Sequence, residues 1–246
     1  MTSEPTTEQP PAESRAAGPT EYRQYRFAPP PGACEILLVR HGESAAVVPG
    51  VEIPLVDGHD DPALSLDGRV QADRLAVRLT AERIDAIYVS SLRRTQETAA
   101  PTAAAHALTP TIEHDLREVF LGEWEGGLFR QRVIENDPIA EAMFREGRWD
   151  VIPGAESHEQ LAGRLVPVLD RIAATHPDQR IMVVVHGGVI GSLMAHASGA
   201  EPFAFVGADN ASISHLVIHD GRWIVRRFND TGHLDGELSS QAEALT

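Results

Sequence analysis

Residues 37–44 read Leu-Leu-Val-Arg-His-Gly-Glu-Ser, an apolar run that ends abruptly in an arginine, a histidine and a glycine. The apolar part, from Ile36 to Val39, predicts a short strand that is buried on both faces. Arg40 and His41 then fall at the carboxyl end of that strand, where open α/β sheets bind their ligands. The sequence therefore predicts a cation and an imidazole at the ligand-binding edge of a sheet.

A second strand-like run ends in the same way. Residues 181–185 read Ile-Met-Val-Val-Val, and His186, Gly187 and Gly188 follow directly. Two histidines at the ends of two strands, one of them beside an arginine, are typical of a site that handles phosphate. The reason is that the planar guanidinium group binds phosphate oxygens in pairs.

Composition limits the class of protein. The chain has 246 residues, 42% of them hydrophobic, which suits one large α/β domain or two small ones. A formal net charge of −15 argues against non-specific binding to nucleic acid or to a membrane, since either needs a basic face. No apolar run is long enough to cross a bilayer and no secretory signal pattern is present, so we expect a cytoplasmic protein.

The basic residues and the single cysteine exclude further chemistry. All 21 basic residues are arginine, so lysine Schiff bases and a phosphate-loop lysine are excluded. Cys34 is the only cysteine, which excludes a disulfide framework or a thiolate zinc site. Residues 59–61 (His-Asp-Asp) could suggest a metal site, but three neighbours on one loop are more often solvated. We therefore expect no metal and no cofactor.

The rest of the pattern alternates strands with helices between two tails. We expect residues 1–33 to be a disordered tail, residues 34–233 to be one domain and residues 234–246 to be a flexible tail. Further strands are expected at 84–89 and Ile112, and in a closing hairpin of 213–218 with 223–228. Helices are expected at 66–79 after the cap Ser65, at 91–106, at 161–172 after the capping box 157–160, and at 189–196. This alternation predicts a three-layer α/β sandwich with a mostly parallel central sheet flanked by helices.

Two further segments add charge to the predicted site. Residues 89–99 place Arg93 and Arg94 where a strand passes into a helix, and helix N-termini attract anions. Residues 116–126 form a glycine-punctuated loop that carries three carboxylates, Glu118, Glu123 and Glu125.

Together these motifs resemble the histidine phosphatase superfamily, which includes the cofactor-dependent phosphoglycerate mutases and many small phosphatases. The motifs occur in the family's order over residues 35–230. They are Arg40-His41-Gly42, the Ser-Ser-Leu-Arg-Arg segment 90–94 with Thr98-Ala99, Glu118 ahead of Gly-Glu-Trp-Glu-Gly at 122–126, and His186-Gly187-Gly188. The resemblance implies a phosphoglycerate mutase-like fold.

The resemblance also implies a role for each matching residue. His41 would attack phosphorus and form a phosphohistidine, while a backbone carbonyl holds the proton on its other ring nitrogen. Glu118 would protonate the leaving oxygen and then take a proton from the attacking water. The phosphoryl oxygens would be held by Arg40, Arg94 and His186, with further contacts from the Ser44 hydroxyl and the Gly187 N–H.

Some assignments stay open. The family usually supplies an asparagine soon after the serine, whereas residues 45–49 here read Ala-Ala-Val-Val-Pro. That phosphate contact is therefore either lost or supplied by another residue, such as His59. Arg93 is expected to be solvated or to lie at the rim of the site, with an exchange of roles with Arg94 left open. Spacing before the Gly-Glu-Trp-Glu-Gly turn favours Glu118 over Glu123 and Glu125.

The function implied by the resemblance is that of a metal-independent phosphomonoesterase acting on a small phosphorylated metabolite. A phosphoglycerate mutase is one alternative, although the turn at 121–126 resembles the phosphatases more than the His-Tyr-Gly turn of mutases. A non-catalytic phosphate-ligand-binding or regulatory protein on the same fold is the other. Residues 129–153 predict a helical cap that selects the substrate, with its aromatic residues on the sheet and its arginines solvated or, alternatively, one of them on the substrate. A homodimer is left open.

Overall fold

The computed structural model describes residues 22–234. The expected tails therefore lie largely outside the described residues, and the described part of the first one, residues 22–33, forms no helix or strand. Within residues 22–234, no helix is both long and apolar enough to span a bilayer.

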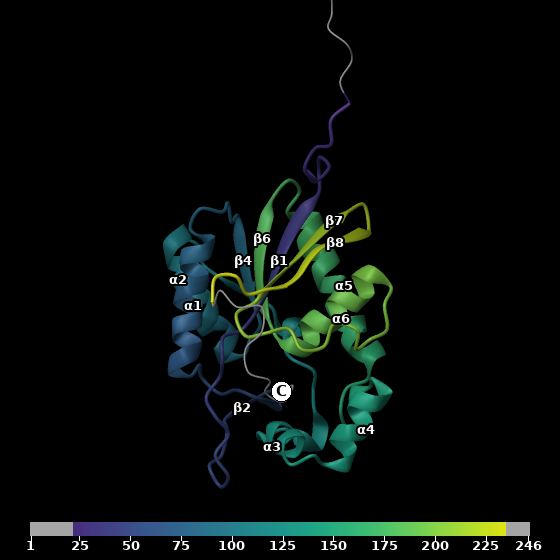
Figure 1. Ribbon diagram of the computed structural model, residues 1–246. Helices are drawn as coiled ribbons and strands as arrows, with labels where there is room; N and C mark the ends of the chain where they lie inside the picture. The colour runs from purple at the N-terminus through teal and green to yellow at the C-terminus, as the bar shows by residue number, and fades with distance from the viewer. Residues whose placement is uncertain (1–21, 235–246) are drawn as a thin grey trace, which may run out of the picture.

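A six-stranded sheet forms the centre of the molecule (Figure 1). Its strands are β1 (Cys34–Arg40), β4 (Ala86–Val89), β5 (Thr111–Ile112), β6 (Arg180–Val185), β7 (Ile213–His219) and β8 (Arg222–Asp230). They lie in the order β5-β4-β6-β1-β7-β8, in which the first four are parallel. Strand β7 runs antiparallel to β1, and β8 runs antiparallel to β7. The predicted mostly parallel sheet is confirmed.

Helices cover both faces of this sheet (Figure 1). They are α1 (Leu66–Leu79) and α2 (Arg93–His106) on one face, and α5 (His158–Thr175) and α6 (Gly187–Ser198) on the other. Strand β1 contributes side chains to the cores on both faces of the sheet, because successive side chains of a strand point to opposite faces. Leu37 packs in one core with Leu75 of α1, whereas Leu38 packs in the other with Leu165 of α5. The three-layer α/β sandwich is therefore confirmed.

Local signals explain where the helices begin. The Ser65 hydroxyl accepts the N–H of Gly68 at the start of α1, and Ser157 forms a reciprocal capping box with Gln160 at the start of α5. Helix α6 begins at Gly187, two residues earlier than the sequence predicts, directly after His186. The site histidine therefore occupies the N-cap position of a helix.

A small lobe lies beyond the carboxyl ends of the parallel strands (Figure 1). It consists of the hairpin β2 (Leu55–Val56) and β3 (His59–Asp60), helices α3 (Leu128–Ile134) and α4 (Pro138–Glu146), and the 3-10 turns η2 (Gly122–Trp124) and η3 (Trp149–Val151); a further turn, η1 (His114–Leu116), precedes it. The predicted helical cap is thus present. Of its aromatic residues, Trp149 packs against the core under the sheet as predicted, whereas Phe129 and Phe144 pack with Trp124 and Met143 in a core of the lobe's own.

Candidate active site

Parallel pairing of β1 with β6 brings the two histidine motifs together. Arg40 lies beside Val185 in the register, and the His41 N–H donates to the carbonyl of Val185 at 2.9 Å. The imidazole of His41 then meets that of His186 edge-on, with the ring centroids 5.2 Å apart. Both rings are buried, so the two strand ends form one site rather than two.

His41 has the form that a nitrogen nucleophile requires. Its Nδ1 lies 2.7 Å from the carbonyl oxygen of Gly42. Because a carbonyl oxygen can only accept, Nδ1 carries the proton and donates this hydrogen bond, which leaves a lone pair on Nε2. Burial, followed by the positive charges of Arg94 and Arg40, lowers the pKa of His41 well below its ordinary value. The imidazole is therefore neutral at physiological pH.

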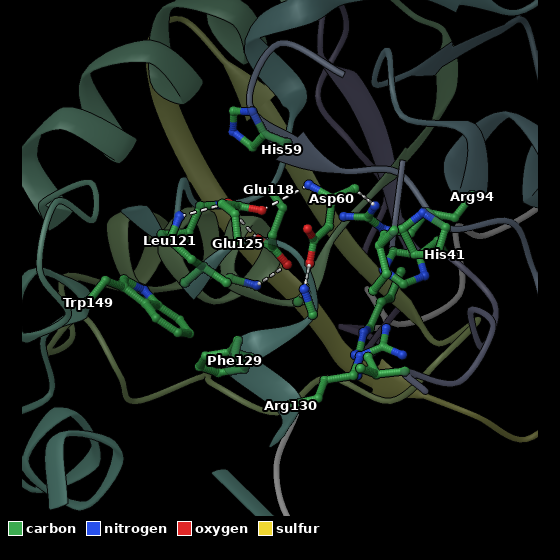
Figure 2. Close-up of a pocket in the computed structure, with 18 of the residues that line it drawn as sticks. His41, His59, Asp60, Arg94, Glu118, Leu121, Glu125, Phe129, Arg130 and Trp149 are labelled. Atoms are coloured by element: carbon green, nitrogen blue, oxygen red, sulfur yellow. Dashed lines mark hydrogen bonds between the residues drawn. The ribbon is translucent and has the colours of Figure 1, made fainter. Parts of the chain in front are cut away.

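Two guanidinium groups line the pocket beside His41, as Figure 2 shows for Arg94. Arg40 comes from the end of β1 and donates to the carbonyl of Ala208. Arg94 comes from the first turn of α2, is 6% exposed, and donates to the carbonyl of Asp60. Burial lowers the pKa of Arg94 to about 10, so the group still carries its charge at neutral pH.

The neighbouring arginine faces elsewhere. The Arg93 side chain is exposed and forms an ion pair with Glu97 at 2.6 Å along the surface of α2. Of the two consecutive arginines, Arg94 is the one that lines the pocket. The spacing of the motif, rather than the residue type, distinguishes the arginine that lines the pocket from its exposed neighbour.

His186 is fully buried, and only one of its two ring nitrogens has a hydrogen-bond partner among the described residues. Its Nε2 lies 2.9 Å from the hydroxyl of Ser90, whereas its Nδ1 has no hydrogen-bond partner among the described residues. An unpaired buried ring nitrogen costs free energy unless a ligand or a water completes it. Burial and the charge of Arg94 lower the pKa of His186 well below its ordinary value.

Two carboxyl groups of the 116–126 loop reach the pocket (Figure 2). Glu118 accepts the N–H groups of Gly188 and Val189 at the N-terminus of α6, each at 3.3 Å. Its negative charge favours the charged forms of Arg40 and Arg94. A Cβ on Gly188 would lie only 2.8 Å from Glu118 Oε1. The absence of a side chain at Gly188 therefore leaves room for this carboxylate.

Glu125 also lies in the pocket, which spacing in the sequence did not favour. Its oxygens accept the N–H groups of Leu121 at 2.9 Å and Asp60 at 2.8 Å. Burial raises the pKa of Glu125 to about 7. Glu123, the third carboxylate of the loop, is exposed and lies outside the pocket. The 116–126 loop therefore brings two carboxyl groups, Glu118 and Glu125, into the pocket beside that of Asp60.

The sequence predicted that the side chains of residues 59–61 are solvated, but in the structure they contact other parts of the protein. His59 is buried with its ring 5.3 Å from that of Phe120, and Figure 2 shows it directed away from His41. The carboxylate of Asp60 accepts the N–H groups of Gly126 and Gly127, and that of Asp61 accepts the N–H of Arg93. Across residues 22–234, no three His, Cys, Asp or Glu side chains are grouped so that they could hold a metal ion.

Ser44 has an unexpected partner. It is buried, and its hydroxyl accepts a hydrogen bond from Nη2 of Arg130, whose Nη1 donates to the carbonyl of Ala45 at 3.2 Å. Arg130 comes from α3 of the small lobe, lines the pocket, and lowers the pKa of His41 through its charge. A third guanidinium therefore contacts the start of the loop in which the family pattern has an asparagine. Gly187 lines the pocket on the other side, next to the guanidinium of Arg40.

Comparison with known proteins agrees with this geometry. Residues 36–231 match the sequence model of the histidine phosphatase superfamily (branch 1). Phosphoglycerate mutase-like protein 4 of Arabidopsis thaliana is 38% identical, over 82% of this chain and 87% of that protein. The metal-independent phosphoserine phosphatase of Arabidopsis thaliana is 35% identical, over 81% of this chain and 83% of that protein. A solved mycobacterial glucosyl-3-phosphoglycerate phosphatase superposes with a TM-score of 0.68 at 29% identity, covering 81% of this chain and all of that one. The chain belongs to the histidine phosphatase superfamily.

Proposed function

We propose that the protein is a metal-independent phosphomonoesterase that hydrolyses a small phosphorylated metabolite through a phosphohistidine at His41. The observation that carries the proposal is the neutral His41 imidazole, whose Nδ1 faces the Gly42 carbonyl while Arg40 and Arg94 line the same pocket. A relative that is 35% identical is named a metal-independent phosphoserine phosphatase, which supports the same reaction class.

The first step transfers the phosphoryl group to His41. The ester binds with its phosphoryl oxygens toward the guanidinium groups of Arg40 and Arg94, which neutralise the negative charge. Nε2 of His41 attacks phosphorus, so that a P–N bond forms while the bond to the ester oxygen breaks. The Glu118 carboxylate takes up a proton when the anionic ester binds beside it and gives that proton to the leaving oxygen, so the alcohol departs neutral.

The second step regenerates the enzyme. The Glu118 carboxylate takes a proton from a water molecule, whose oxygen attacks phosphorus as the P–N bond breaks. Inorganic phosphate leaves, and both His41 and Glu118 return to their starting forms. In this account the unpaired Nδ1 of His186 and the N–H of Gly187 hold phosphoryl oxygens, and Arg130 supplies through Ser44 the contact that the missing asparagine gives elsewhere.

A phosphoglycerate mutase is the second candidate, because a relative that is 38% identical is named phosphoglycerate mutase-like. A mutase must protect its phosphohistidine from water, since hydrolysis aborts the cycle. Release of phosphate and isomerisation of 3-phosphoglycerate, measured side by side, separate the two. Faster isomerisation than hydrolysis would overturn the proposal.

The third candidate is a protein that binds a phosphate-containing ligand without turnover. The test is the release of p-nitrophenol from p-nitrophenyl phosphate in excess chelator, with His41→Ala as the control. We expect release by the wild type and none by the variant; no release by either would favour the binding protein. The domain limits 34–233, a cytoplasmic location and a homodimer stay predictions from the sequence.

A further inference from the structure

The pocket has two chemically different ends. One holds His41 with the guanidinium groups of Arg40, Arg94 and Arg130. The other is apolar and comes mainly from the small lobe and the loop that faces it. Its wall includes Val47, Ile53, Leu121, Phe129, Phe144 and Trp149. Figure 2 shows Phe129 and Trp149 across the pocket from Arg94 and His41.

The arginines of the pocket wall are all held near the nucleophile. Arg94 is tied to the carbonyl of Asp60, and Arg130 is tied to Ser44 and Ala45, which follow His41 closely in the chain. The charge of Arg130 also lowers the pKa values of Arg40 and Arg94, as expected when the three guanidinium groups share one end of the pocket. Among the described residues that line the pocket, none therefore offers a cation to the apolar end.

The carboxylates between the two ends already have partners. Asp60 accepts two backbone N–H groups of the 126–127 turn, and Glu125 accepts those of Leu121 and Asp60. A second anionic group on the substrate would face these carboxylates and an apolar wall without a counter-ion, which is costly. A substrate ammonium group would lose its hydration against the apolar wall, and the carboxylates of Asp60 and Glu125 already accept two backbone N–H groups each.

The aromatic wall is built to hold a flat apolar group. Phe129 packs against Trp124 and Trp149 with ring centroids 6.3 and 6.1 Å apart, and Trp149 packs on Phe203 at 4.8 Å. These contacts fix the rings, yet Phe129 and Trp149 remain half-buried and line the pocket. Half-exposed aromatic surface beside a polar reaction centre is typical of a site for an apolar ligand part.

We infer that the enzyme selects phosphate monoesters whose alcohol part is apolar and uncharged, seated against Phe129 and Trp149. This inference rests on the proposed phosphatase function. The phosphate end supplies the charge recognition that every monoester shares, and the apolar end supplies the selection among alcohols. A phosphorylated amino acid or hydroxy acid would leave its carboxylate unpaired at that end.

The test is a series of esters that share one linker: propyl, 3-phenylpropyl, 3-carboxypropyl and 3-aminopropyl phosphate. The substituent lies three carbons from the ester oxygen, so the leaving groups have similar basicity and differences in kcat/KM report binding at the apolar end. We expect kcat/KM for the phenyl ester on the order of tenfold or more above that of propyl phosphate. We expect the carboxylate and ammonium esters to fall to or below propyl phosphate.

Substitution of the wall provides the second measurement. Trp149→Leu and Phe129→Leu should reduce the ratio of kcat/KM for the phenyl ester to that for propyl phosphate several-fold. Phe27→Leu, at an aromatic residue outside this pocket, should leave the ratio unchanged. The ratio is independent of the fraction of protein that is folded, so partial misfolding does not mimic the effect.

The outcomes distinguish failure of the proposed phosphatase function from failure of the inferred substrate class. If none of the four esters is hydrolysed, the proposed phosphatase function fails. If all are hydrolysed but the carboxylate or ammonium ester matches or exceeds the phenyl ester, the phosphatase function stands and the inferred substrate class is overturned. An unchanged ratio in both wall variants would also overturn it.

Discussion

The ring of His186 meets the ring of His41 edge-on, at a centroid distance of 5.2 Å and an angle of 62° between the planes. Each ring follows directly on one of two adjacent parallel strands, so the geometry of the sheet sets their separation. Burial keeps both imidazoles neutral, and nearby arginines add to the effect. In the proposed reaction this uncharged pair would offer a nucleophile and a hydrogen-bonding group to one phosphoryl group.

The neutral histidines predict how stability depends on pH. In the unfolded chain both imidazoles have the ordinary pKa near 6.5, whereas in the folded protein the pKa values of His41 and His186 are well below it. Below pH 6.5 the unfolded state therefore binds more protons, and the free energy of unfolding decreases by up to about 1.4 kcal/mol per pH unit for each histidine. Above pH 6.5 the two residues cause no change.

Urea unfolding at pH 7.5, 6.0 and 5.0 checks this prediction. His41→Asn should make the decline below pH 6.5 shallower by about 1.4 kcal/mol per pH unit. A variant with the same slope as the wild type would show that His41 is protonated in the folded protein.

Glu118 should matter most for esters that leave poorly. Glu118→Gln removes the proton that the leaving oxygen needs, so alkyl phosphates should slow by about 10²-fold or more, and p-nitrophenyl phosphate much less. Glu125→Gln serves as the rival variant, because Glu125 lies in the same pocket with its pKa raised to about 7. It should slow all esters to a similar extent. The reverse pattern would assign the acid role to Glu125.

Arg130 should contribute to phosphate binding. Arg130→Met removes a guanidinium that contacts Ser44, and a lost charge-assisted contact should raise both KM and the inhibition constant of inorganic phosphate by about tenfold or more. Arg132→Met on the same helix is the control, since Arg132 is exposed and pairs with Asp137. Equal constants in the two variants would remove Arg130 from the phosphate site.

A close backbone approach should make Gly68 indispensable. A Cβ at this position would lie 2.0 Å from the carbonyl oxygen of Glu43, in the loop that follows His41. Gly68→Ala should therefore lower the free energy of unfolding by about 1–3 kcal/mol and lower kcat, because the loop must shift. Gly163→Ala in α5, where a Cβ meets nothing within 4 Å, should raise stability by about 0.5–1 kcal/mol. Changes of the same sign in both variants would contradict the close approach.

Local signals predicted most of the fold. The apolar period and the cap at Ser65 predicted a helix over 66–79, which the structure confirms. The Asp-Gly turn predicted the β7–β8 hairpin, and Asp220 and Gly221 both have positive φ there, at 48° and 69°. Each of these features depends on residues that are close in the sequence, which explains why the sequence could predict them.

The missed features depend on how the small lobe docks. Arg130 reaches Ser44 because α3 faces the loop that follows β1, with Gly127 at the start of α3 in close approach to Val47 and Ile53. Glu125 is half-buried and accepts the N–H of Asp60 in β3, and the Asp60 carboxylate accepts an N–H of the 126–127 turn. Neither the hydrophobic periodicity nor the spacing of motifs in the sequence predicts how close these separate segments lie in the folded protein.

The proposed reaction requires a covalent bond between phosphorus and His41. Rapid acid-free quenching of the enzyme with a ³²P-labelled monoester, followed by peptide mapping of the label, detects that bond directly. We expect an alkali-stable, acid-labile label on the peptide that contains His41, and none in His41→Ala. A label that persists in His41→Ala, or that maps to another residue of the wild type, would contradict it.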